Sequence, residues 1–139
     1  MTVKTMRLSF QTRGEAQVID ITREVAQTVR ESAVQAGIVT VFVPGATGAL
    51  TTIEYESGAV SDFQRLFDEI VPPNKHYAHN ARWGDGNGHS HVRASLLGPS
   101  LTVPFADGDL LLGTWQQIIF VDFDNRSRSR NLVVQIMGE

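Results

Sequence analysis

All four histidines of this 139-residue chain fall in one short stretch, residues 76–91. They are His76, His79, His89 and His91. Imidazole nitrogen is a common ligand of zinc and of other transition metals, so clustering of this kind indicates a metal site. We expect a divalent metal ion, such as zinc, to be held by His79, His89 and His91. The alternative is that these are exposed polar side chains of a loop.

Two carboxylates are candidates to work with the histidines. Glu54 ends a predicted strand and could serve as an acid, a base or a further metal ligand that leaves one position for water or substrate. Asp85 lies just before the last two histidines. We predict Glu54, Asp85 and His91 as catalytic residues, although glutamates on a strand surface are more often merely solvated.

The glycine-rich segment 84–88 surrounds Asp85 and could let main-chain amides approach an anion. It does not match a P-loop, because no Lys-Ser or Lys-Thr pair follows it. It does not match a calcium loop either, since Ser90 and Leu96 stand where glycine and glutamate are required. We interpret it as a flexible turn that presents Asp85 and the histidines.

Other polar side chains near the expected site could hold a small phosphorylated substrate. Guanidinium groups bind phosphate, hydroxyl and amide groups orient it, and a tryptophan before an apolar strand is either core or a lid over a pocket. The predicted substrate-binding residues are Thr47, Arg82, Arg93, Trp115 and Gln116. Asn87 joins them through the resemblance described below.

Composition limits the function classes. Twelve Lys and Arg residues against fifteen Asp and Glu give a net charge of −3, which argues against a nonspecific binder of nucleic acid or of an anionic membrane. No apolar run reaches the roughly 18 residues of a membrane span, and the first residues lack a signal segment, so we expect a cytoplasmic protein. The absence of cysteine excludes disulfides and a thiolate nucleophile. The length predicts one domain, residues 1–139.

The elements that must position these residues follow from the apolar spacing. Alternation over 3–11 and 16–21 predicts an opening hairpin, and helical spacing predicts a helix from Asp20 or Thr22 to Gly37. The β-branched run 38–43 is typical of a strand buried on both faces.

The rest of the chain predicts one more helix and several strands. The helix covers 59–70 and is ended by Pro72 and Pro73, whereas residues 75–91 read as a long loop. Strands are expected at 49–54, 100–105, 110–112, 116–123 and 132–137, with hairpins at 106–109 and 124–129. The fold class is therefore α+β, with a mainly antiparallel β-sheet core and two amphipathic helices.

Several of these segments carry a resemblance. Ser100–Pro104, Gly108 and Leu112–Ile118, which contains Gly-Thr-Trp-Gln, resemble the signature of the YjbQ-like family. Further matches are Ala49–Thr51 with Glu54, Tyr77 with His79, and His91 leading into Ser95–Gly98. The resemblance covers nearly the whole chain, and some members of the family are described as secondary thiamine-phosphate synthases.

The resemblance implies a YjbQ-like fold and a homotrimer with its pocket near a subunit boundary. It implies a cluster of Glu54, His79 and His91, with Asp85 and Asn87 nearby, facing the Gly-Thr-Trp-Gln segment. One position departs from the family: many members carry a His-Thr pair where this chain has Gly45 and Ala46. We expect His89 to take the place of that histidine.

Three functions stay open from the sequence. The resemblance implies a thiamine-phosphate synthase, which joins a pyrimidine pyrophosphate to a thiazole phosphate. The histidines fit a metal-dependent hydrolase or lyase at least as well, because magnesium prefers oxygen ligands. The third is a non-enzymatic protein that binds a metal or an anion.

Overall fold

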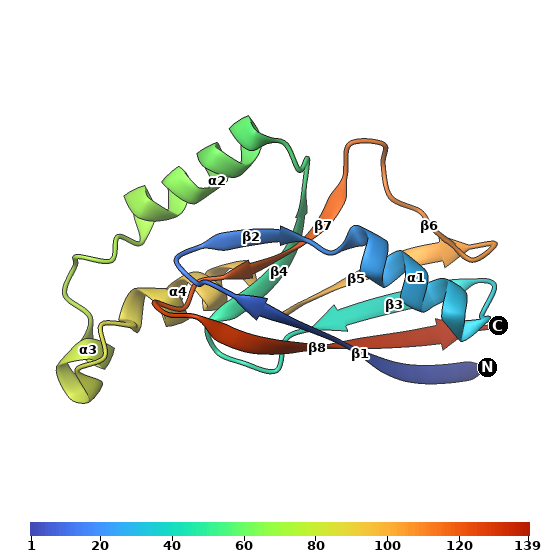
Figure 1. Ribbon diagram of the computed structural model, residues 1–139, viewed down its shortest axis with the longest axis horizontal. Coiled ribbons are helices and arrows are strands. Elements are labelled where there is room, and N and C mark those ends of the chain that lie inside the picture. The colour runs from blue at the N-terminus through green and yellow to red at the C-terminus, as the bar shows by residue number, and fades with distance from the viewer.

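Eight strands divide between two antiparallel sheets in the computed structural model, which describes residues 1–139 (Figure 1). The five-stranded sheet has the order β1-β8-β3-β5-β6, and the three-stranded sheet has the order β2-β7-β4. The strands are β1 (Thr2–Thr12), β2 (Gln17–Asp20), β3 (Gly37–Phe42), β4 (Gly48–Ile53), β5 (Ser100–Ala106), β6 (Asp109–Leu110), β7 (Gln117–Asp122) and β8 (Arg128–Gly138). The α+β class and the antiparallel pairing are confirmed.

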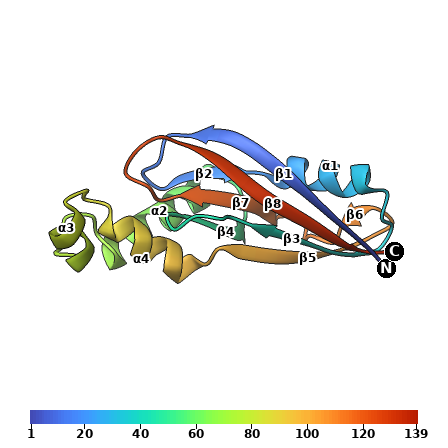
Figure 2. The same cartoon turned by 90° about the horizontal axis from the view of Figure 1, so that it is seen from below.

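Four helices accompany the sheets, not the two that the sequence predicts. They are α1 (Thr22–Ser32), α2 (Ser57–Ile70), α3 (Ala78–Trp83) and α4 (Gly88–Leu97). Helix α1 lies toward the end of the molecule that carries both chain termini, and α3 and α4 lie at the opposite end (Figures 1 and 2). None of the helices has the length and apolar character needed to cross a membrane.

The larger core cluster lies between the two sheets and α1. Alternation along β8 buries Leu132, Val134 and Ile136 completely, and they pack with Val25 and Val29 of α1. Burial of each such side chain contributes about 1.5–3 kcal/mol, so this cluster supplies most of the force that holds α1 on the sheets.

The strand buried on both faces is β7 rather than the predicted 38–43. Ile118 and Phe120 belong to the larger cluster, whereas Ile119 and Val121 belong to a smaller one that includes residues of α2 and α4. On β3 only alternate residues are buried, and Ile38 is 42% exposed. The prediction was wrong because an uninterrupted apolar run does not reveal whether a second layer covers it.

Two predicted hairpins are wrong. Strand β1 pairs with β8 and β2 pairs with β7, so the first two strands belong to different sheets. The turn between them contains three successive residues with positive φ, Gly14, Glu15 and Ala16, which redirect the chain. Strands β7 and β8 are likewise divided between the sheets. The hairpin at 106–109 is confirmed as β5–β6.

Helix α2 agrees with its prediction, and α1 is shorter than predicted. The side chain of Glu56 accepts hydrogen bonds from the main-chain N–H groups of Gly58 and Ala59, which caps α2. Helix α1 stops at Ser32 because Ala33 adopts a left-handed conformation with φ of 61°. Glu56 therefore has a capping role.

The predicted loop 75–91 instead contains α3 and the start of α4. Gly84 ends α3 with φ of 66°, and Gly88 opens α4. The first residues of α4 are buried by α3 as well as by β4. Burial on more than one side leaves the helix without one clear apolar face, so its sequence is only weakly amphipathic. The prediction missed it because the glycines marked helix ends and not an open loop.

Candidate functional site

The rings of His79 of α3 and His91 of α4 are in tilted contact at the junction of the two helices. Their ring centroids lie 4.4 Å apart with the planes inclined by 39°. Oδ1 of Asp85 lies 3.3 Å from Nδ1 of His79, within ion-pair distance, although this Nδ1 is buried without an aligned hydrogen bond. We call His79, Asp85 and His91 the His–Asp cluster.

Local main-chain geometry brings the three residues together. Asp85 Oδ1 accepts the N–H of Asn87, and the N–H of Gly88 donates to Asn80 Oδ1. A Cβ atom at Gly88 would lie 2.6 Å from Cβ of Tyr77, which is closer than real Cβ atoms come. Only glycine allows α4 to begin this close to α3, so Gly88 fixes the approach of His91 to His79.

A small hollow of about 230 Å³ opens beside His91. Its wall is formed by the β3–β4 turn on one side and by α4 on the other. The lining residues are Gly45, Ala46, Gly48, His91, Ala94, Ser95 and Pro99. The turn contributes only Gly45, Ala46 and Gly48 to the lining, so no bulky side chain of the turn fills the hollow.

His89 does not join His91, which corrects the prediction that the two converge. Two residues along a helix correspond to a rotation of about 200°, so their side chains diverge. His89 is 4% exposed, and its ring centroid lies 6.3 Å from that of Tyr77. Burial lowers the pKa of His89 below its ordinary value, and the charge of Arg93 lowers this pKa further. His89 is thus a buried neutral side chain, not a replacement for the family's histidine.

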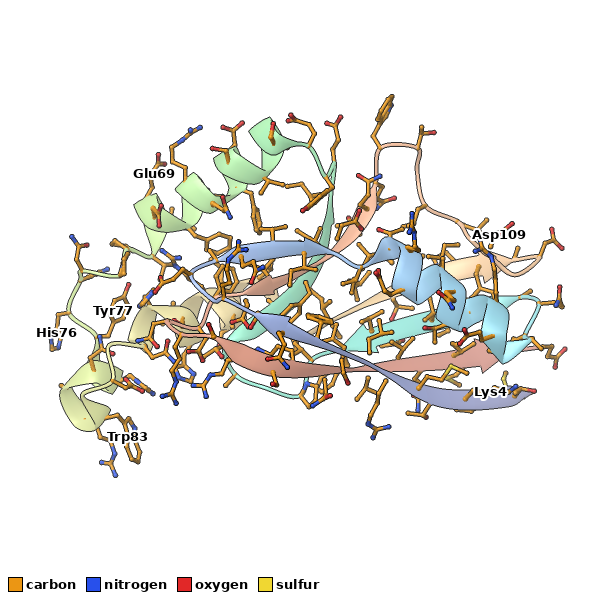
Figure 3. All side chains as sticks on the ribbon, viewed as in Figure 1. Lys4, Glu69, His76, Tyr77, Trp83 and Asp109 are labelled. Carbon is orange, nitrogen blue, oxygen red and sulfur yellow. The ribbon has the colours of Figure 1, made fainter.

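The predicted substrate arginines do not point into the hollow. Arg93 is 4% exposed, donates from Nε to the carbonyl of Val71 and forms an ion pair with Asp68, so it fastens α2 to α4. Arg82 lies on the surface of α3 with its guanidinium over the ring of Trp83. Figure 3 shows Trp83 and His76 projecting at the end of the molecule.

Glu54, Trp115 and Gln116 lie outside the His–Asp cluster. Glu54 is exposed and follows the end of β4. It lies six residues beyond Gly48, which lines the hollow beside His91, and six residues of extended chain span about 20 Å. Trp115 is 73% exposed on the loop before β7. Gln116 donates from Nε2 to Thr52 Oγ1 at 3.2 Å and closes one end of a different cavity.

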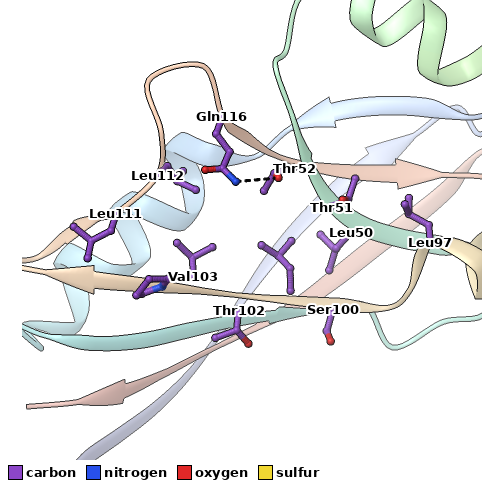
Figure 4. Close-up of a pocket in the computed structure, with 12 residues that line it drawn as sticks. Leu50, Thr51, Thr52, Leu97, Ser100, Thr102, Val103, Leu111, Leu112 and Gln116 are labelled. Atoms are coloured by element: carbon purple, nitrogen blue, oxygen red, sulfur yellow. Dashed lines mark hydrogen bonds between the residues drawn. The ribbon is translucent and has the colours of Figure 1, made fainter.

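That second cavity is a neutral groove of about 380 Å³ between β4 and β5 (Figure 4). Leucines and hydroxyl side chains line it, and no charged residue does. Its walls include Thr51, Thr52, Ser100, Thr102, Leu112 and Gln116. Most of the segments that carry the family resemblance therefore form this groove.

A third hollow, of about 370 Å³, shares Asp85 with the His–Asp cluster. Its five lining residues are all polar: Asp85, Asn87, Asn125, Arg126 and Arg128. We call it the arginine hollow. The predicted residue Asn87 is buried at its base, 5% exposed.

The chain is similar to known proteins over nearly its whole length. The model of the UPF0047, YjbQ-like family matches residues 6–139. A UPF0047 protein of Methanothermobacter thermautotrophicus is 39% identical over 139 residues, covering 100% of this chain and 95% of the relative. The UPF0047 protein YugU of Bacillus subtilis is 35% identical, covering 98% of this chain and 99% of the relative.

The chain belongs to the UPF0047, or YjbQ-like, family.

Solved YjbQ-like structures agree with the fold. A YjbQ-like protein of unknown function from Sulfolobus solfataricus superimposes with a TM-score of 0.89 at 31% identity, covering 99% of this chain and 100% of that one. An uncharacterised family member from Clostridium acetobutylicum gives 0.87 at 35% identity, covering 95% and 99%. None of these descriptions assigns an activity.

The YjbQ-like chain gathers too few donors for a metal within one subunit. No group of three or more His, Cys, Asp or Glu side chains is positioned to hold an ion. His79 and His91 supply two imidazoles, and a zinc site takes at least three protein ligands. His79, His89 and His91 therefore do not fit a zinc site on their own.

Sequence reasoning missed a buried charged network next to the cluster. Asp122 and Asp124 are 0% and 1% exposed, and Arg130 donates two hydrogen bonds to Asp122. Thr47, predicted to bind substrate, is 6% exposed and bridges Asp124 and Arg130 through its hydroxyl. Two sequence patterns could have predicted this network, Asp-Phe-Asp at 122–124 and Arg-Ser-Arg at 128–130. In a strand, residues two apart lie on the same face, so the two aspartates share one face and the two arginines share another.

The network also sets the charge of Asp124. Burial by itself raises the pKa of this carboxyl, but hydrogen bonds from Thr47 and Arg128 and the charge of Arg128 outweigh burial and hold the pKa below its ordinary value. Asp124 is therefore anionic, and the β3–β4 turn beside His91 is anchored to β7 and β8.

Proposed function

We propose that this YjbQ-like protein is a transferase for small phosphorylated compounds, with thiamine-phosphate synthase activity. The observation that carries the proposal is the ring contact between His79 and His91, with Asp85 at 3.3 Å from His79, beside a hollow bounded by small residues. Family resemblance supports the choice of reaction. The geometry supports proton transfer next to a site for a flat ring.

The reaction needs a stabilised leaving group. The C–O bond between the pyrimidine methylene and its pyrophosphate breaks, and the electron pair leaves with pyrophosphate. The lone pair of the thiazole nitrogen then forms the new C–N bond. A proton donor and positive charge near the departing oxygen both lower the barrier, and a hollow that holds both rings adds orientation.

The His–Asp cluster supports these roles. His91 lines the hollow and is the side chain that would donate a proton to the departing oxygen. His79 packs on its ring and Asp85 lies behind His79, so these two position His91. No step is assigned to Glu54, which lies beyond the end of β4 and outside the His–Asp cluster, or to a metal ion.

A divalent metal such as zinc remains a prediction from the histidine cluster. Two imidazoles would need at least one further protein ligand, which a second copy of the chain would have to supply. A metal-dependent hydrolase or lyase is accordingly less well supported than the transferase.

We also propose that the protein forms a homotrimer, as the family resemblance implies. An uncovered face of the five-stranded sheet supports self-association. Three cross-strand rows on this face contain one charged side chain, Arg7, among residues such as Val3, Ile38, Phe42 and Met137, each of which is more than a third exposed. A face poor in charge suits a second copy better than a nucleic acid or an anionic membrane. Light scattering should give three subunit masses, and one subunit mass would contradict the proposal.

Direct assay tests the activity. The purified protein should form thiamine phosphate from the two substrates, and His91→Gln should lower the rate by about 10²-fold or more. His76→Gln is the matched control, because His76 is an exposed histidine with no hydrogen bond or ion pair in the structure. Product formation unchanged in His91→Gln, or absent from the wild type, would contradict the proposal.

A further inference from the structure

The arginine hollow lies where two loops that are distant in sequence meet. The N–H of Asn125 donates to Asn87 Oδ1 at 3.1 Å, and Asn125 Nδ2 donates to the carbonyl of Asp85 at 2.8 Å. Main-chain N–H groups of Glu15 and Arg126 donate to the carbonyl and the carboxylate of Asp124. Both walls of the hollow are therefore held by hydrogen bonds before any ligand binds, which lowers the entropic cost of binding.

The hollow retains unused donors. Arg126 forms no ion pair, and its guanidinium makes no hydrogen bond. Arg128 donates from Nε to Asp124 at 3.1 Å, which leaves its terminal Nη groups free. Planar guanidinium groups with free N–H donors bind phosphate oxygens bidentately.

The lining also limits the ligand. None of the five residues is apolar, so the hollow offers no surface on which a ring could pack. One carboxylate, that of Asp85, faces the hollow, but it accepts the N–H of Asn87 and lies against His79. The carboxylate of Asp124 offsets the charge of Arg128, whereas Arg126 has no ion-pair partner. The uncompensated charge of Arg126 and the free Nη donors of Arg128 favour the anionic phosphate end of a ligand.

We propose that the arginine hollow binds a diphosphate group, with Arg126 as its principal ligand and Arg128 as the second. The assignment of this diphosphate as the leaving group rests on the proposed function. Asp85 forms part of both the hollow and the His–Asp cluster, so a diphosphate held here borders the cluster at Asp85, whereas His91 lines the neighbouring small hollow. Arg126 and Arg128 thus take the phosphate-binding role that we predicted from the sequence for Arg82 and Arg93.

Calorimetric titration with inorganic pyrophosphate tests the site without any assay of activity. The wild type should bind pyrophosphate more tightly than orthophosphate, and Arg126→Gln should weaken pyrophosphate binding about tenfold or more, because a charge-assisted hydrogen bond contributes that much. Arg65→Gln is the charge-matched control, since Arg65 is an exposed arginine of α2 that pairs only with Asp62. Amide resonances of residues 85–88 and 124–128 should shift in the wild type.

The outcomes separate this site from the proposed reaction. Pyrophosphate binding that Arg126→Gln abolishes supports the hollow even if no thiamine phosphate is formed, in which case only the proposed function fails. Equal affinity in wild type and Arg126→Gln, or no binding at all, overturns the diphosphate site even if the synthase reaction is observed.

Discussion

Arg130 binds Asp122 through two parallel hydrogen bonds, Nε to Oδ2 at 2.7 Å and Nη2 to Oδ1 at 2.9 Å. The carboxylate is completely buried, and the arginine side chain is 11% exposed. Thr12 donates a further hydrogen bond to Asp122, so the pair joins β1, β7 and β8. Because β7 and β8 belong to different sheets, this ion pair connects the two sheets beside the β3–β4 turn.

Asp122→Ala should lower the free energy of unfolding by about 3–5 kcal/mol, because it leaves the Arg130 charge buried without its partner. Urea denaturation measures the change. Asp62→Ala is the control, since Asp62 pairs with Arg65 on the surface of α2 and should cost less than about 1 kcal/mol. Equal stability of the two variants would show that the Arg130 charge is compensated in another way.

Stability should fall as the pH drops from neutral through the ordinary histidine range because of His89. Burial lowers its pKa in the folded state, so the unfolded chain binds a proton at a higher pH than the folded chain does. Protons therefore favour unfolding as the pH falls through the ordinary histidine pKa of about 6.5 toward the lower folded value. Thermal melting across this range should show the loss in wild type and in His76→Gln.

His89→Gln should have a flatter pH dependence in the same range, because glutamine does not titrate. A slope as steep as that of the wild type would assign the effect to another group. Asp124 makes a separate contribution to the pH dependence of stability. Its lowered pKa stabilises the fold at neutral pH, and this stabilisation is lost only as the pH falls through the acidic carboxylate range.

Gly88→Ala should destabilise the protein by about 1–3 kcal/mol, because the new methyl group would contact Tyr77 and Asn80 too closely. The same change should separate α4 from α3 and lower activity, since it moves His91 away from His79. Gly113→Ala is the control, with its nearest neighbour at an ordinary 3.6 Å. Denaturation and the synthase assay measure the two effects, and a fully stable, fully active Gly88→Ala protein would contradict the role of this glycine.

Elemental mass spectrometry of the untagged protein tests the metal prediction. If the histidines hold a zinc-type ion, we expect near-stoichiometric metal that is lost in His79→Ala and in His91→Ala, because either change leaves one imidazole. His76→Ala should retain the metal. Absence of metal after loading would contradict the prediction and leave the His–Asp cluster with a proton-transfer role.

The sequence determined the class of the fold, the amphipathic helix α2, the β5–β6 hairpin and the concentration of histidines in one stretch. These features depend on local spacing: apolar residues at helical intervals in α2, positive-φ residues at 107–108, and capping by Glu56. Residue type and clustering singled out His79 and Asp85, whereas Asn87 was predicted from the family resemblance.

Only the tertiary structure decided which of these residues act together. The sheet assignment of β1, β2, β7 and β8 depends on long-range pairing that no local pattern encodes, and it creates the buried network around Asp122. His89 and His91 diverge because residues 88–97 form a helix that is stabilised by packing. The arginines that we propose for phosphate binding differ from those predicted for the same reason. Arg93 is enclosed by α2, whereas the β7–β8 turn places Arg126 in one hollow with Asp85, 41 positions earlier in the chain.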